Sequence, residues 1–145
     1  MILNNQKFNL SQFPENYHLI AIHSDLDEFR LAFFLNKKLN ICLKRKINDI
    51  YIAEQDASYS QFEFLDETKY LKWIFFSNKS LVSEKISDEE FSLFGKGNKV
   101  LNKMNLLSQQ KAVDYFLIIE NIANKTYIDK VLKKISEINS VITSF

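Results

Sequence analysis

Residues 17–39 read YHLIAIHSDLDEFRLAFFLNKKL, and this stretch decides the fold. Tyr17–His23 is a short apolar run with β-branched residues, which is typical of a buried strand. Ser24 follows, with Asp27 three residues later, and this spacing resembles a capping box at the start of a helix. The stretch therefore predicts a strand followed by a helix that runs from about Asp25 to about Leu39.

The expected helix is apolar on more than one side. Its broad apolar side holds Leu26, Phe29, Ala32, Phe33, Leu35 and Leu39. Leu31 and Phe34 fall off that side, so the helix has a second surface to cover. That surface packs either against another part of the same domain or against a partner, and Leu31 and Phe34 are the candidate contact residues. Asn36 lies on the apolar stripe, so we expect its amide to bond nearby backbone.

The rest of the chain alternates between strand and turn patterns before a second helix. Residues 113–119 are a strongly apolar run, and the helix after them begins at Asn124 or Thr126. Residues 86–108 show no clear pattern. The segments expected to form extended strands are 41–53, 59–65, 69–77, 81–85, 113–119 and 141–145, with a turn at 66–68.

This order predicts an α+β fold built on a mainly antiparallel sheet. We expect a ferredoxin-like element order with an extra central hairpin and with the two principal helices on one face. Residues 16–145 are expected to form a single domain. Residues 1–15 are polar and aperiodic, and we expect a flexible N-terminal segment there.

Composition narrows the class of function. Lysine and arginine total 19 and aspartate and glutamate 18, so the net charge of +1 gives no strong field for nucleic acid or anionic lipid. Apolar runs stay well below the ~18 residues of a membrane helix. The start of the chain does not resemble a signal peptide, and one cysteine excludes an internal disulfide. We expect a cytoplasmic protein without a membrane association.

The residue types that carry most chemistry are sparse. His18 and His23 are five apart, so on one strand they point to opposite faces and cannot share a metal. Cys42 lies between two apolar residues, and we expect it to be buried in a strand. Gly95-Lys96-Gly97 is too short for a P-loop. These patterns predict neither a metal nor a cofactor.

The segment Lys69–Phe76 interleaves basic and aromatic residues. On a ferredoxin-like sheet such a strand can stack single-stranded RNA bases. The Lys/Arg-Gly-Phe pattern of RNA-recognition domains is absent, and an aromatic strand packed in the core is the favoured interpretation.

Four stretches resemble the IPExxxVDY family of small bacterial proteins. They are residues 18–45, the YSQFEFLD arm at 59–66, Trp73–Lys79, and LLSQQKAVDYFLIIE at 106–120. Val113, Asp114 and Tyr115 match the second half of the naming motif. Leu107, Ser108 and Gln109 stand where the family has Ile-Pro-Glu. Glutamine cannot carry the charge of the family's glutamate, which argues against a catalytic role for the motif in this chain.

Asp114 and Tyr115 are the motif residues that the chain retains. We expect an inward Asp114 to pair with Arg30, Arg45 or a lysine, because an unpaired buried charge is costly. A ligand contact is the alternative for Asp114.

The function favoured by these observations is a non-enzymatic interaction or regulatory module, with either a homodimer or another protein as partner. The first alternative is a small-ligand sensor with an arrangement like that of ACT domains, which is an analogy at the level of the fold. Single-stranded RNA binding is a further alternative, and an enzyme is the least favoured.

Overall fold

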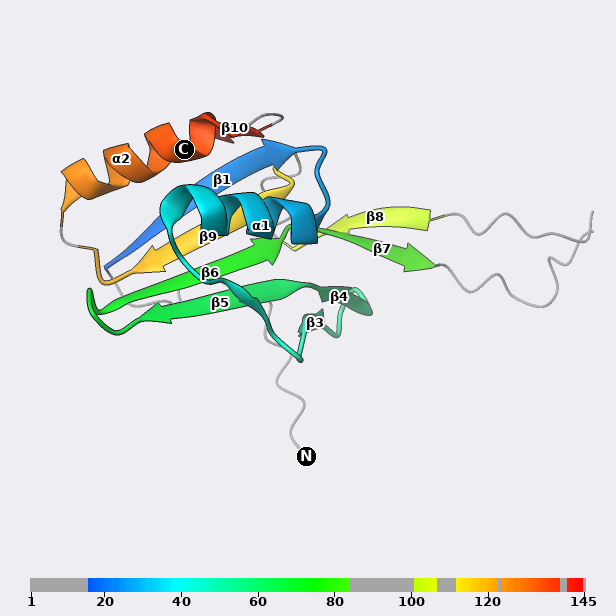
Figure 1. Ribbon diagram of the computed structural model, residues 1–145. Helices are drawn as coiled ribbons and strands as arrows, with labels where there is room; N and C mark the ends of the chain where they lie inside the picture. Colours follow the sequence, from blue (N-terminus) through cyan, green and yellow to red (C-terminus); the bar gives the residue numbers. More distant parts are fainter. Residues whose placement is uncertain (1–15, 84–100, 107–111, 123, 139–140, 145) are drawn as a thin grey trace, which may run out of the picture.

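The computed structural model describes residues 16–83, 101–106, 112–122, 124–138 and 141–144 (Figure 1). The expected flexible segment 1–15 and residues 107–109, where the family has Ile-Pro-Glu, lie outside the described residues. The elements in chain order are β1 (Tyr17–Ser24), α1 (Glu28–Leu39), β2 (Lys44–Arg45), β3 (Ile50–Ile52), β4 (Ala57–Tyr59), β5 (Gln61–Asp66), β6 (Leu71–Ser77), β7 (Lys79–Ser83), β8 (Leu101–Asn105), β9 (Tyr115–Glu120), α2 (Lys125–Ser136) and β10 (Val141–Ser144).

The described strands form one large sheet and two hairpins. The sheet has six strands in the order β10-β1-β9-β6-β5-β2, and every neighbouring pair is antiparallel. The strands β3 and β4 form one separate hairpin, and β7 and β8 form the other. The expected α+β class with a mainly antiparallel sheet is therefore confirmed.

Both faces of the sheet are covered. The two helices lie on one face (Figure 1), and residues of both belong to a single buried cluster with Ile20, Ile22 and Trp73. The opposite face carries a second cluster, which includes Phe116 and residues of the β3–β4 hairpin. Successive residues of a strand point to opposite faces, so the continuous apolar runs of β1 and β9 supply both clusters at once.

The first helix is shorter than its sequence suggests. It begins at Glu28, because Asp27 and not Ser24 is the cap: its side chain accepts a hydrogen bond from Arg30 N at 2.9 Å. Ser24 Oγ accepts from Leu26 N at 3.1 Å and closes a turn before the helix. The helix ends at Asn40, which adopts the left-handed conformation with φ 54°.

The expected single strand over residues 41–53 is wrong. Only Lys44–Arg45 and Ile50–Ile52 are strands, and a polar turn separates them. Arg45 pairs with Asp49 across this turn, and Gln61 Nε2 donates to Asn48 O at 2.9 Å. Cys42 lies before β2 and is exposed, so its expected burial is also wrong. Alternation alone could not reveal these local polar contacts.

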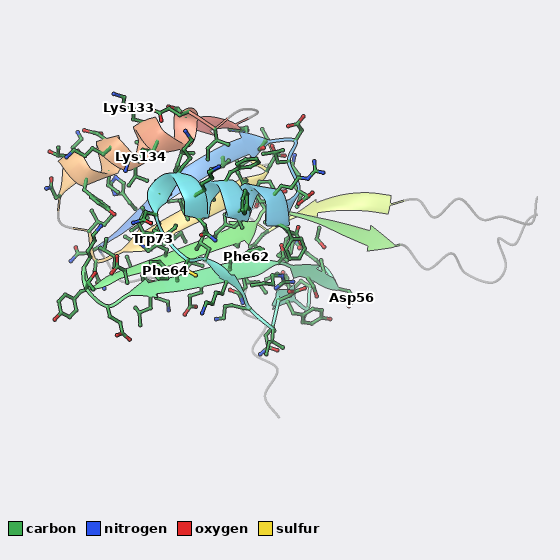
Figure 2. All side chains as sticks on the ribbon, in the orientation of Figure 1. Asp56, Phe62, Phe64, Trp73, Lys133 and Lys134 are labelled. Carbon is green, nitrogen blue, oxygen red and sulfur yellow. The ribbon has the colours of Figure 1, made fainter. Side chains whose placement is uncertain are left out.

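The expected hairpin between residues 59–65 and 69–77 is confirmed as β5 and β6, with Phe64 opposite Trp73. Asp66 Oδ1 accepts from Thr68 N and Lys69 N at the turn, at 3.1 and 3.2 Å. Trp73, Phe75 and Phe76 on β6 are buried, so the packed interpretation of this aromatic strand is confirmed. Figure 2 shows Phe62, Phe64 and Trp73 alongside α1, in the helix-side core.

The second helix follows its sequence pattern closely. Asn124 is the cap, and its side chain accepts from Thr126 N at 2.9 Å. Ile128, Val131 and Ile135 are buried at helical spacing, as expected for an amphipathic helix.

Candidate functional site

A polar junction forms where β1 ends, β9 begins and β6 leads into β7; we define it as Ser24, Asn78, Lys79 and Asp114. The Asp114 carboxylate accepts from Lys79 Nζ at 2.7 Å and from Ser24 N at 2.9 Å. Its backbone is also engaged, because Asp114 O accepts from Asn78 N at 2.9 Å. The expected charge pair is therefore confirmed, and the partner is a lysine.

The two arginines considered as partners of Asp114 lie elsewhere. Arg30 pairs with Asp27 at 3.6 Å, and Arg45 pairs with Asp49. Sequence alone could not choose among these cations, because Lys79 is 35 residues from Asp114 and reaches it only through the pairing of β6 with β9.

Asn78 connects the β7–β8 hairpin to the rest of this junction. It is fully buried, and its Nδ2 donates to Val113 O at 2.9 Å. Its carbonyl accepts from Leu106 N, just after β8, at 2.8 Å. We interpret the junction as structural. The Asp114 carboxylate and the Lys79 ammonium bond to each other, so neither is placed as a free base or nucleophile.

Tyr115 is the second retained motif residue, and it points into the helix-side core. Its ring packs against Phe75 with centroids 5.3 Å apart, and its hydroxyl donates to Leu26 O at 2.7 Å. Burial of the ring, and then the carboxylates of Glu28 and Asp114, raise the pKa of Tyr115 to about 12. Tyr115 therefore holds the start of α1 on the sheet in its neutral, hydrogen-bonding form.

Asn36 joins α1 to the segment that follows it. Its Oδ1 accepts from Leu43 N at 2.7 Å, and its Nδ2 donates to Leu43 O at 3.2 Å. The side-chain amide thus pairs with Leu43 as a neighbouring strand would. The expected bond to nearby backbone is confirmed, and Asn36 is a structural residue.

The outer surface of α1 differs from the expectation. Leu31 is fully buried, so of the two alternatives it packs within its own domain and is not a contact residue for a partner. Phe29 and Phe33, which were assigned to the apolar stripe, are each 61% exposed, whereas Phe34 is 37% exposed, as expected for a residue off the stripe. The face that packs on the sheet is set by Leu31, Ala32 and Leu35.

These exposed rings form one continuous surface, which we call the aromatic patch: Phe29, Phe33 and Phe34. Phe29 and Phe33 are four residues apart and are neighbours on the helix. The Phe33 and Phe34 rings meet edge to face at 5.6 Å. Phe29 meets the buried Phe62 in the same way at 5.8 Å, which links the patch to the core. The helix carries too many large apolar residues for one stripe, and that excess was the sequence signal for this patch.

Two further features are absent from the part of the chain that the structure describes. No three His, Cys, Asp or Glu side chains come together there as metal ligands. No helix of the described part is both long and apolar enough to cross a membrane.

Comparisons with known proteins found no matching family model, no matching curated protein and no matching solved structure. The fold defines the class as an α+β protein with a two-helix layer on an antiparallel sheet. Its candidate binding surface is the aromatic patch.

Proposed function

We propose that this protein is a non-enzymatic interaction module that binds a protein partner through the outer surface of α1. The observation that carries the proposal is the exposure of Phe29 and Phe33, each at 61%. Contiguous exposed aromatic surface on a folded domain commonly marks a protein contact.

The area of the patch is large enough to matter for binding. A phenylalanine offers roughly 200 Å², so Phe29 and Phe33 each leave roughly 120 Å² in water. At ~25 cal/mol per Å², covering both would contribute about 6 kcal/mol before the costs of association. Such aromatic residues are the kind that dominate binding energy at the centre of an interface.

The geometry of the two motif residues and of Asn36 supports a binding role over a catalytic one. The carboxylate of Asp114, the hydroxyl of Tyr115 and the amide of Asn36 each hold neighbouring elements of the fold together. Their bonding leaves α1 in a defined position on the sheet, and a rigid helix is a good platform for a binding surface.

Three further proposals accompany this one. Membership of the IPExxxVDY family rests on the quoted stretches and on Val113-Asp114-Tyr115. A ferredoxin-like arrangement is supported by the neighbouring strands β10, β1, β9 and β6, with α1 after β1 and α2 between β9 and β10. A cytoplasmic location is supported by the free, exposed thiol of Cys42.

The test compares two variants with the native protein. Phe29→Ser/Phe33→Ser removes most of the patch. Ile47→Ser/Leu65→Ser is the matched control, because it removes two exposed apolar residues that lie outside α1, at 99% and 57% exposure. Light scattering measures self-association, and affinity capture from cell extract measures retention of other proteins.

We expect the native protein and the control to retain the same partner, or to form the same oligomer, and the patch variant to lose it. Equal retention by all three proteins would contradict the proposal. Circular dichroism spectra of the variants check that each one is folded.

A further inference from the structure

The helix layer that carries the aromatic patch is basic, although the chain as a whole is nearly neutral. The helix α1 contains three cationic residues, Arg30, Lys37 and Lys38, and one acidic residue, Glu28. In α2, four lysines accompany one aspartate. The residues of the two helices alone sum to a net charge of +5. The cap residues Asp27 and Glu137, which pair with Arg30 and Lys38, reduce this to +3, whereas the whole chain has +1.

Several of these cations are available to a partner. Lys37, Lys133 and Lys134 are exposed, and none of them forms a salt bridge with the residues that the structure describes. Lys38 meets Glu137 at 3.7 Å, which is an exposed pair and so a weak one. Figure 2 shows Lys133 and Lys134 on α2, and α2 packs with α1 on the same face of the sheet.

We infer that the partner of the aromatic patch is an acidic protein segment with apolar anchors, which inserts its apolar side chains among the phenylalanines and places its carboxylates near the lysines of α1 and α2. This inference rests on the proposed function and names the chemistry of the partner. Complementary charge around an apolar centre speeds association and excludes wrong partners.

A second copy of the chain fits this surface poorly. A two-fold dimer places the same patch of both subunits against itself. Through the helix layer, such a dimer would place two surfaces of net positive charge against each other, and like charges oppose association.

A membrane surface also fits less well than a protein segment. A helix that lies on a bilayer buries its own apolar face in the lipid. In α1 that face is already used, because Leu31 and Leu35 are fully buried in the core. The Phe29 ring also packs edge to face with Phe62 at 5.8 Å, and this contact holds it at the protein surface.

The test uses two synthetic amphipathic peptides that share their leucine positions. One has glutamate at its polar positions and the other has lysine. The protein variant Lys37→Glu/Lys133→Glu reverses charge on the helix layer. Its matched control is Lys46→Glu/Lys72→Glu, because Lys46 and Lys72 both approach Glu63, at 3.1 and 3.9 Å, and Glu63 alternates with the helix-side Phe62 along β5.

Fluorescence anisotropy at low salt measures binding of each labelled peptide. We expect the acidic peptide to bind the native protein and the control variant, to bind the charge-reversed variant about tenfold or more weakly, and to weaken as salt rises. We expect the lysine peptide to bind at least about tenfold more weakly than the acidic one to the native protein.

Three results would overturn the inference: no binding of the acidic peptide, equal binding of the two peptides, or equal binding by the charge-reversed and native proteins. Binding to anionic phosphatidylserine vesicles without binding to the acidic peptide would overturn it in favour of a membrane. The Phe29→Ser/Phe33→Ser variant separates the two proposals. If it loses a partner that the charge-reversed variant keeps, only the acidic partner is wrong; if it keeps every partner, the proposed function fails.

Discussion

Asp114→Asn is expected to destabilise the protein, because the polar junction needs a group that accepts on both sides. The carboxylate accepts from Lys79 Nζ and from Ser24 N. An asparagine amide has one oxygen, so in either orientation its NH₂ group faces one of those two donors. One bond is lost and two donors are left in contact.

The magnitude follows from the type of bond and its exposure. Hydrogen bonds to charged groups contribute roughly 1.5–3 kcal/mol. The side chains of Lys79 and Asp114 are 33% and 26% exposed, and water partly screens the pair. We therefore expect a loss of about 2 kcal/mol in the free energy of unfolding, which lowers the urea midpoint by about 1 M.

Urea unfolding followed by circular dichroism measures this change. Asp25→Asn is the matched control, because Asp25 is exposed and makes no hydrogen bond or ion pair within the described part of the chain. We expect the control to change stability by less than about 0.5 kcal/mol. A double-mutant cycle with Lys79→Met isolates the pair. If Asp114→Asn costs no more than the control, or if the cycle shows no coupling, the junction does not stabilise the fold as argued.

Three other substitutions test separate parts of the structure. Tyr115→Phe should cost about 1 kcal/mol at neutral pH through the lost hydrogen bond. The pKa of Tyr115 in the folded protein is raised from 10.0 to about 12, so the tyrosine contributes stability that is present below pH 10.0 and lost as the pH rises to about 12. In alkaline unfolding curves, the Tyr115→Phe variant should therefore lose less stability than the native protein across that range. Asn36→Ala should cost about 1–3 kcal/mol in urea unfolding, because the backbone groups of the buried Leu43 lose their partners; an unchanged midpoint would contradict this. Leu31→Ala should cost about 2–5 kcal/mol by thermal unfolding, whereas Phe33→Ala should stay within about 0.5 kcal/mol, and equal effects would mean that the burial pattern of α1 is wrong.

The sequence predicted most of the local structure, because local structure depends on patterns within a few residues. The alternation around Phe64 marked β5, and the apolar spacing of Ile128, Val131 and Ile135 marked α2. The amide of Asn36 was correctly expected to bond nearby backbone, since it stood among apolar neighbours.

The errors came from contacts that are polar or distant in sequence. The sequence pattern predicted a helix that begins after Ser24, whereas the backbone geometry makes Asp27 the cap. The break between β2 and β3 depends on Arg45, Asp49 and Gln61, which no apolar pattern reports.

The sequence by itself determined the class of the fold, the buried character of β1, β6 and β9, and the presence of more apolar surface on α1 than one stripe needs. Only the tertiary structure decided which side of α1 is buried, since Leu31 and Phe33 are equally apolar and the choice depends on how the helix rotates over the sheet. It also decided that Lys79 is the partner of Asp114 and that α1 and α2 lie on the same face of the sheet. Strand pairing and helix packing bring together residues that are far apart in the chain.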